Sequence, residues 1–153
     1  VGVCAMHMQG TPRTMQLDPR YDDVVGEIHA YLAHRRDTLL AAGIAQERIC
    51  LDPGIGFGKT HAHNLTLMSR AGAWLDLGVP ILVGHSRKGF LGRLVEQALG
   101  RPATEAERDA ATAGAACGLA AAGVQVVRVH AVGLVRSALE LFAATAQLTR
   151  PAG

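Results

Sequence analysis

The sequence contains few aromatic residues, only 4% of its 153 positions, so its core has to be built from alanine, valine, leucine and isoleucine. Charged residues are also scarce, at 18%, whereas 49% of the residues are hydrophobic, a composition that argues against a disordered chain. The length is sufficient for one domain with a sizeable core, and the 18 glycines predict many tight turns.

No run of lysine or arginine is present and the net charge is only +2, which argues against a nucleic-acid-binding surface. No signal peptide opens the sequence, and Gly123 divides the weakly charged stretch Ala110–Val127 into a predicted helix and strand rather than a membrane span. We therefore expect a cytoplasmic protein without nucleic-acid or membrane partners. The sequence starts in strand-like residues without Met, as expected for the interior of a longer protein.

Only three cysteines occur, Cys4, Cys50 and Cys117, and none belongs to a C-x-x-C motif. An odd number at wide spacing argues against a disulfide framework or a zinc site and is typical of a reducing compartment. We expect all three to be small buried residues.

The sequence is organised as four repeats of an apolar strand, a polar or glycine-rich loop and a helix. The strands are predicted at Val1–Met8, Arg48–Leu51, Pro80–Val83 and Val124–Val129. Helices are predicted over Tyr21–Ala42, after Asn64, after Lys88 and over Leu134–Gln147. A further, alanine-rich helix is predicted to end at Ala122 and to begin at an N-cap that is either Thr104 or Asp109. The tail Arg150–Gly153 is predicted to be frayed. Such α/β repeats indicate a parallel sheet, as either a small open sheet or half of an eight-stranded barrel.

Polar residues gather directly after each predicted strand, at the end where α/β proteins bind ligands. They are His7 and Gln9, Asp52, Ser86 with Arg87 and Lys88, and Arg128 with His130. Strand alternation places Arg128 and His130 on one face, and an arginine buried there requires an anionic ligand or a structural carboxylate partner.

The segment Asp52–Thr60 is the densest cluster of polar and glycine residues. It resembles a phosphate-binding P-loop, but Pro53 stands where that motif requires glycine, and Gly54 and Gly58 are separated by one residue too few. The P-loop interpretation is therefore rejected. A metal site at His61-x-His63 is not expected either, because no third ligand accompanies the pair.

Four segments together resemble the dihydropteroate synthase family. They are Met6–Pro12, Leu51–Lys59 with Asn64, Gly84–Phe90 and Arg128–His130, in the family's order and spacing. Members of this family condense 6-hydroxymethyl-7,8-dihydropterin pyrophosphate with p-aminobenzoate and release pyrophosphate. The resemblance implies that residues 1–153 are the C-terminal half, strands five to eight, of a pterin-binding (β/α)8 TIM barrel.

The resemblance also implies roles for individual residues of a folate-biosynthesis transferase. Asp52, Lys88, Arg128 and Met6 are expected to bind the pterin, Arg128 and His130 the pyrophosphate, and Phe57 and Ser86 the p-aminobenzoate. Where the family usually has Asp after Arg-Val-His, this sequence has Ala131, a change that could loosen the support of His130.

The half of the family that this sequence lacks is expected to hold the Mg²⁺ ligands, so no metal ligand is predicted in this chain. The chain alone is expected to be inactive, and the complete enzyme to be a homodimer. Two alternatives stay open: a methyltetrahydrofolate-binding methyltransferase of the same fold, and a non-catalytic fragment that only binds a pterin.

Overall fold

The computed structural model describes residues 1–146, in which four βα units follow one another. The strands are β1 (Val3–Met6), β2 (Ile49–Asp52), β3 (Leu82–Val83) and β4 (Val126–Val127). The helices are α1 (Val24–Ala41), α2 (His61–Ser69), α3 (Gly89–Leu99), α4 (Glu105–Ala121) and α5 (Val132–Thr145). Two 3-10 helices, η1 (Gln46–Arg48) and η2 (Ala71–Leu77), flank β2 and α2.

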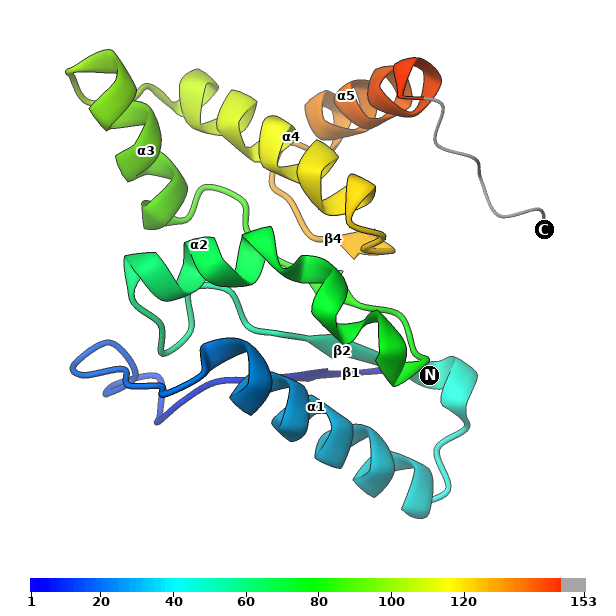
Figure 1. Cartoon of the computed structure of the whole chain (residues 1–153). Helices are drawn as coiled ribbons and strands as arrows, with labels where there is room; N and C mark the ends of the chain where they lie inside the picture. Colours follow the sequence, from blue (N-terminus) through cyan, green and yellow to red (C-terminus); the bar gives the residue numbers. More distant parts are fainter. Residues whose placement is uncertain (147–153) are drawn as a thin grey trace.

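The strands are parallel and lie side by side in sequence order. β1 pairs with β2, β3 pairs with β4, and a single bridge between Leu51 and Ile81 joins the two pairs. Figure 1 shows α1 and α2 lying along β1 and β2, with α4 and α5 near β4 and α3 beside α4. None of the helices within residues 1–146 combines the length and hydropathy needed to cross a membrane.

One face of the strands is covered by helices and the other is not. Ile49, Leu51, Ile81 and Val83 are at most 1% exposed and belong to the main core. The strand residues that alternate with them form what we call the open face: Cys4, Cys50, Leu82 and Val126. Cys4 is exposed, and both Cys50 and Cys117 are only half-buried, so the expectation that all three cysteines are buried is wrong.

Helix α2 begins earlier than the sequence predicts. Thr60 caps the helix by accepting from the backbone N–H of His63, whose side chain accepts in turn from the backbone N–H of Thr60. This reciprocal cap, with histidine in place of the usual glutamate, satisfies two otherwise unpaired donors and starts the helix at His61 rather than after Asn64.

The remaining predicted elements are present with shifted ends. Thr104, not Asp109, is the N-cap of α4. Strands β1, β3 and β4 are shorter than predicted, and β4 is reduced to two residues. The predicted end of the last helix at Gln147, and the predicted frayed tail, lie outside the described residues.

Candidate active site

Residues that follow β2, β3 and β4 meet at the carboxyl end of the sheet. A cavity of about 320 Å³ there is lined by Phe57, Gly84, Ser86, Lys88, Arg128, Val129 and His130. Five of the seven predicted site residues thus border one space, and they come from three different βα units. The other two, Asp52 and Met6, lie directly opposite each other in the register of β1 and β2.

Asp52 is the buried acid of the site, with only 1% of its surface exposed. Its Oδ1 accepts a hydrogen bond of 2.7 Å from the backbone N–H of Gly54, and its Oδ2 lies 3.7 Å from Nη2 of Arg128. Burial raises the pKa of Asp52, and the Gly54 hydrogen bond and the Arg128 charge oppose that rise. The carboxylate is therefore held by few partners and keeps acceptor capacity for a ligand.

Arg128 does not occupy the buried position that the sequence predicts. Its side chain is 58% exposed, because nothing within residues 1–146 covers this end of β4. The sequence also predicts an anionic partner for Arg128, and Asp52 supplies that charge.

Lys88 crosses the site from the start of α3. Its Nζ donates to the carbonyl of Ile55 and lies 4.4 Å from the centre of the Phe57 ring. Burial lowers the pKa of Lys88 to about 8, against the opposing effect of Asp52. The amine thus lies over an aromatic ring and is influenced by the charge of the buried acid Asp52.

Ser86 and His130 form a connected pair between β3 and β4. Ser86 is 6% exposed, and its Oγ accepts from the backbone N–H of His130 at 3.2 Å. The same oxygen lies 2.9 Å from Nδ1 of His130. This pair fixes the two loops relative to each other.

The loop after β2 requires glycine because its backbone approaches the strand beside it. Gly54 has a φ of +69°, and a Cβ atom at this position would collide with the carbonyl of His7. Asn64 secures the same loop, since its Oδ1 accepts from the backbone N–H of Gly56 at 2.7 Å while its Nδ2 donates to the carbonyl of Thr60.

Sequence reasoning assigns no role to Lys59, which appears there only in the rejected P-loop and at the end of the segment Leu51–Lys59 that carries the family resemblance. Lys59 is 3% exposed, and its Nζ lies 3.0 Å from Nδ1 of His7 and donates to the carbonyl of Phe57 at 2.9 Å. Burial lowers the pKa of Lys59 to about 7 and the pKa of His7 to about 4. One signal could have found it: Lys59 and Lys88 are the only lysines in the sequence, and all other long basic side chains are arginines.

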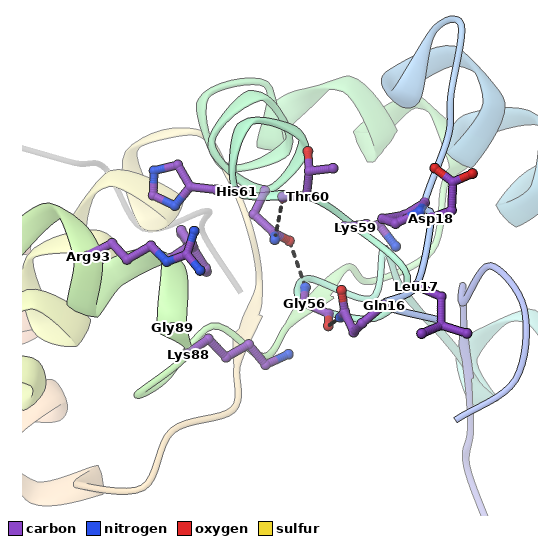
Figure 2. A pocket seen from close by; sticks show the side chains of 13 residues that line it. Gln16, Leu17, Asp18, Gly56, Lys59, Thr60, His61, Lys88, Gly89 and Arg93 are labelled. Carbon is purple, nitrogen blue, oxygen red and sulfur yellow. Dashed lines mark hydrogen bonds between the residues drawn. The ribbon is translucent and has the colours of Figure 1, made fainter. Parts of the chain in front are cut away.

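A second cavity of about 630 Å³ lies on the other side of Lys88. Figure 2 shows Lys88 and Arg93 entering it from the side of α3, with Lys59 on the opposite side. Gly56 borders this cavity and Phe57 borders the smaller one, so the loop after β2 contributes to both.

The described part of the chain contains no group of three or more His, Cys, Asp or Glu side chains arranged to hold a metal ion. His63 is engaged in the cap of α2. The described residues of this chain therefore do not form a metal site by themselves.

Residues 1–130 match the family described as "Pterin binding enzyme". The chain belongs to the pterin-binding enzyme family. Its relatives in this family include the dihydropteroate synthase of Neisseria meningitidis serogroup B, 45% identical over 146 residues, which span 94% of this chain and 50% of the relative. The Escherichia coli K12 dihydropteroate synthase is 39% identical over 143 residues, 94% of this chain and 49% of the relative.

Solved structures of pterin-binding enzymes share the fold. A dihydropteroate synthase from Stenotrophomonas maltophilia superimposes with a TM-score of 0.87 at 45% identity, over 98% of this chain and 55% of that one. The Xanthomonas albilineans enzyme in complex with 7,8-dihydropteroate gives a TM-score of 0.82 at 37% identity, over 98% and 53%. The chain spans about half the length of these relatives, and its α/β fold is part of their TIM barrel. The predicted family and fold class are confirmed.

Proposed function

We propose that this chain forms the half of a dihydropteroate synthase that binds the pterin, the leaving pyrophosphate and p-aminobenzoate. The observation that carries the proposal is the meeting of Asp52, Lys88 and Arg128, from three βα units, at one end of the sheet. The names of the relatives, and the dihydropteroate bound to one of them, support the same activity.

The pterin roles fit the donors and acceptors of each side chain. The Asp52 carboxylate accepts from the amino-pyrimidine edge of the ring, and the Lys88 amine donates to its carbonyl and ring nitrogen. Met6, opposite Asp52 in the strand register, packs against the ring. Arg128, next to Asp52, contacts the pterin as well.

Arg128 and His130 hold the pyrophosphate, since the guanidinium fork matches phosphate oxygens and both side chains border the cavity of about 320 Å³. Phe57 and Ser86 border the same cavity and line the p-aminobenzoate site. In the reaction, the arylamine nitrogen bonds to the methylene carbon of the pterin, the bond from that carbon to the pyrophosphate oxygen breaks, and the amine loses a proton. The protein orients the reactants and stabilises the departing anion, so no covalent nucleophile is needed.

Three further parts of the proposal concern the complete enzyme. We assign the Mg²⁺ ligands to the half that this chain lacks. The complete enzyme is proposed to be a cytoplasmic homodimer, and residues 1–153 to be the C-terminal half of its single barrel domain.

The test is a hybrid barrel, in which this chain is joined to the half of the N. meningitidis enzyme that it does not match. The hybrid barrel is expected to form dihydropteroate from both substrates. Asp52→Ala should weaken pterin binding by about 1–3 kcal/mol for each hydrogen bond removed, because it leaves donors of the ligand unpaired. The control Asp76→Ala removes an exposed carboxylate on η2 and should leave calorimetric affinity unchanged.

Unchanged pterin affinity in both Asp52→Ala and Lys88→Ala would contradict the assignment. A hybrid barrel that binds the pterin but never forms product would instead favour the non-catalytic alternative.

A further inference from the structure

Arg87 has an unusual backbone for its residue type. Its φ is +56°, and it is the one residue other than glycine with a positive φ among residues 1–146. A side chain with a Cβ atom is disfavoured there, so this conformation persists only where surrounding contacts impose it.

Those contacts all come from α4. The guanidinium Nε and Nη2 of Arg87 donate to the two carboxylate oxygens of Asp109 at 2.8 and 2.9 Å. Nη2 also lies 2.7 Å from Glu105, and the backbone N–H donates to Oγ1 of Thr112 at 3.3 Å. The Asp109 side chain is only 12% exposed, and its two-pronged pairing with a planar guanidinium has a geometry that lysine does not reproduce.

The turn at Arg87 sends three consecutive side chains in different directions. Ser86 reaches His130 at the end of β4, Arg87 reaches α4, and Lys88 reaches the loop after β2 at Ile55. The two neighbours of Arg87 therefore line the cavity, while Arg87 itself does not.

We propose that Arg87 is a positioning residue: its pairing with Asp109 holds the turn in the left-handed conformation that aims Ser86 and Lys88 at the ligands. The identity of those ligands rests on the function proposed above, whereas the placement of Lys88 does not. The pairing anchors the turn to α4, so a substitution of either Arg87 or Asp109 should change the position of the Lys88 side chain.

The experiment compares Arg87→Gly, Arg87→Lys and Asp109→Asn in the hybrid barrel, with lysine labelled with ¹³C at Cε. Glycine tolerates the positive φ but removes the ion pair, so it separates the pairing from the backbone strain. The control is Arg101→Gly, because Arg101 also pairs with α4 through both oxygens of Glu107 but contacts no residue of the turn.

Arg87→Gly and Asp109→Asn should shift the Lys88 resonance, leave that of Lys59 in place, and lower kcat/KM at least about tenfold. Arg87→Lys should recover only part of this loss, and Arg101→Gly should change neither readout. The inference is wrong if the Lys88 resonance stays in place in both Arg87→Gly and Asp109→Asn. In that case Arg87 only stabilises the fold, and Arg101→Gly should lower the melting temperature by a similar amount. A hybrid barrel without synthase activity would defeat the proposed function, and the resonances would still decide the role of Arg87.

Discussion

Lys59 and Lys88 are both buried, and burial makes their positive charge costly; the Asp52 carboxylate offsets only part of that cost. Lys59 contacts neutral acceptors, the ring nitrogen of His7 and the carbonyl of Phe57, so no ion pair compensates for its loss of water. Lys59 thus links His7, at the end of β1, to the loop that carries Phe57. Because its buried charge is only partly compensated, the protonated form of Lys59 lowers the free energy of unfolding.

This link predicts a pH dependence of the free energy of unfolding. Burial lowers the pKa of Lys59 from 10.5 to about 7, so between these values the unfolded chain binds more protons than the folded chain. Stability should therefore rise with pH above about 7, by up to about 1.4 kcal/mol per pH unit for one proton. In urea denaturation of the hybrid barrel, Lys59→Met should show a smaller rise of stability with pH than the unsubstituted barrel. Lys88 is present in both barrels, so its contribution to the pH dependence is the same in each. An identical pH slope in both proteins would show that Lys59 does not titrate in this range.

Arg128 and His130 predict a graded loss of pyrophosphate affinity. Arg128→Ala should cost about 1.5–3 kcal/mol, the range for a hydrogen bond to a charged group, and Arg128→Lys should restore only part because lysine lacks the paired donors. His130→Ala should cost less, since the main charge remains. Calorimetry with pyrophosphate in the hybrid barrel checks the order, with exposed Arg70→Ala as the control. Wild-type affinity in Arg128→Ala would make the Asp52 contact a structural ion pair.

Helix α5 begins without a side-chain cap. Its N-cap residue is Ala131, which supplies no hydrogen bond to the first turn. This is the position where the sequence departs from the family's usual aspartate, so the structure connects that departure to helix capping. An aspartate there would accept from an unpaired backbone N–H and interact favourably with the helix dipole.

Ala131→Asp should therefore stabilise the hybrid barrel by about 1 kcal/mol in urea denaturation. Ala131→Asn, which caps without the charge, should retain most of the gain and separates capping from electrostatics. Ala146→Asp, at the other end of α5, is the control and should give no gain, because carboxylates are unfavourable at a helix C-terminus. No stabilisation by Ala131→Asp or Ala131→Asn would disprove the capping explanation.

The sequence was sufficient to predict the four βα units and most of the residues around the smaller cavity, because apolar strands and polar strand ends are local patterns. It was insufficient wherever the outcome depends on partners distant in sequence. The positive φ of Arg87 depends on Asp109, and the burial of Lys59 depends on His7. The exposure of Arg128 was missed because it depends on which residues cover the end of β4.

The open face is the side of the strands that no helix covers within residues 1–146. An apolar hollow of about 410 Å³ lies between the edge strand β4 and α5, and Leu82 and Val126 of the open face line part of it together with Val132. Val126 is 39% and Val132 63% exposed. In relatives twice this length the same fold is part of a barrel, whose remaining strands would pair with the edges of β1 and β4.

Val127 offers a direct test of this completion. Val126 and Arg128 donate their backbone N–H groups to the carbonyls of Ile81 and Val83 on β3. Because successive N–H groups of a strand point to opposite sides, that of Val127 points away from β3, toward the place of the next strand. Val127→Pro removes this donor without breaking the pairing of β3 with β4.

The chain alone should aggregate and show no turnover, whereas adding the missing half, joined or as a separate chain, should give a cooperative fold with activity. Val127→Pro should destabilise the hybrid barrel more than Val127→Ala does, because only proline removes the N–H group that the next strand would accept from. Val127→Ala is the control: it loses side-chain packing but keeps the donor. Size-exclusion chromatography and turnover assays examine the chain alone, and urea denaturation compares the two variants of the hybrid barrel. Robust turnover by the chain alone, or an equal cost of Val127→Pro and Val127→Ala in the hybrid barrel, would show that the open face needs no further strands.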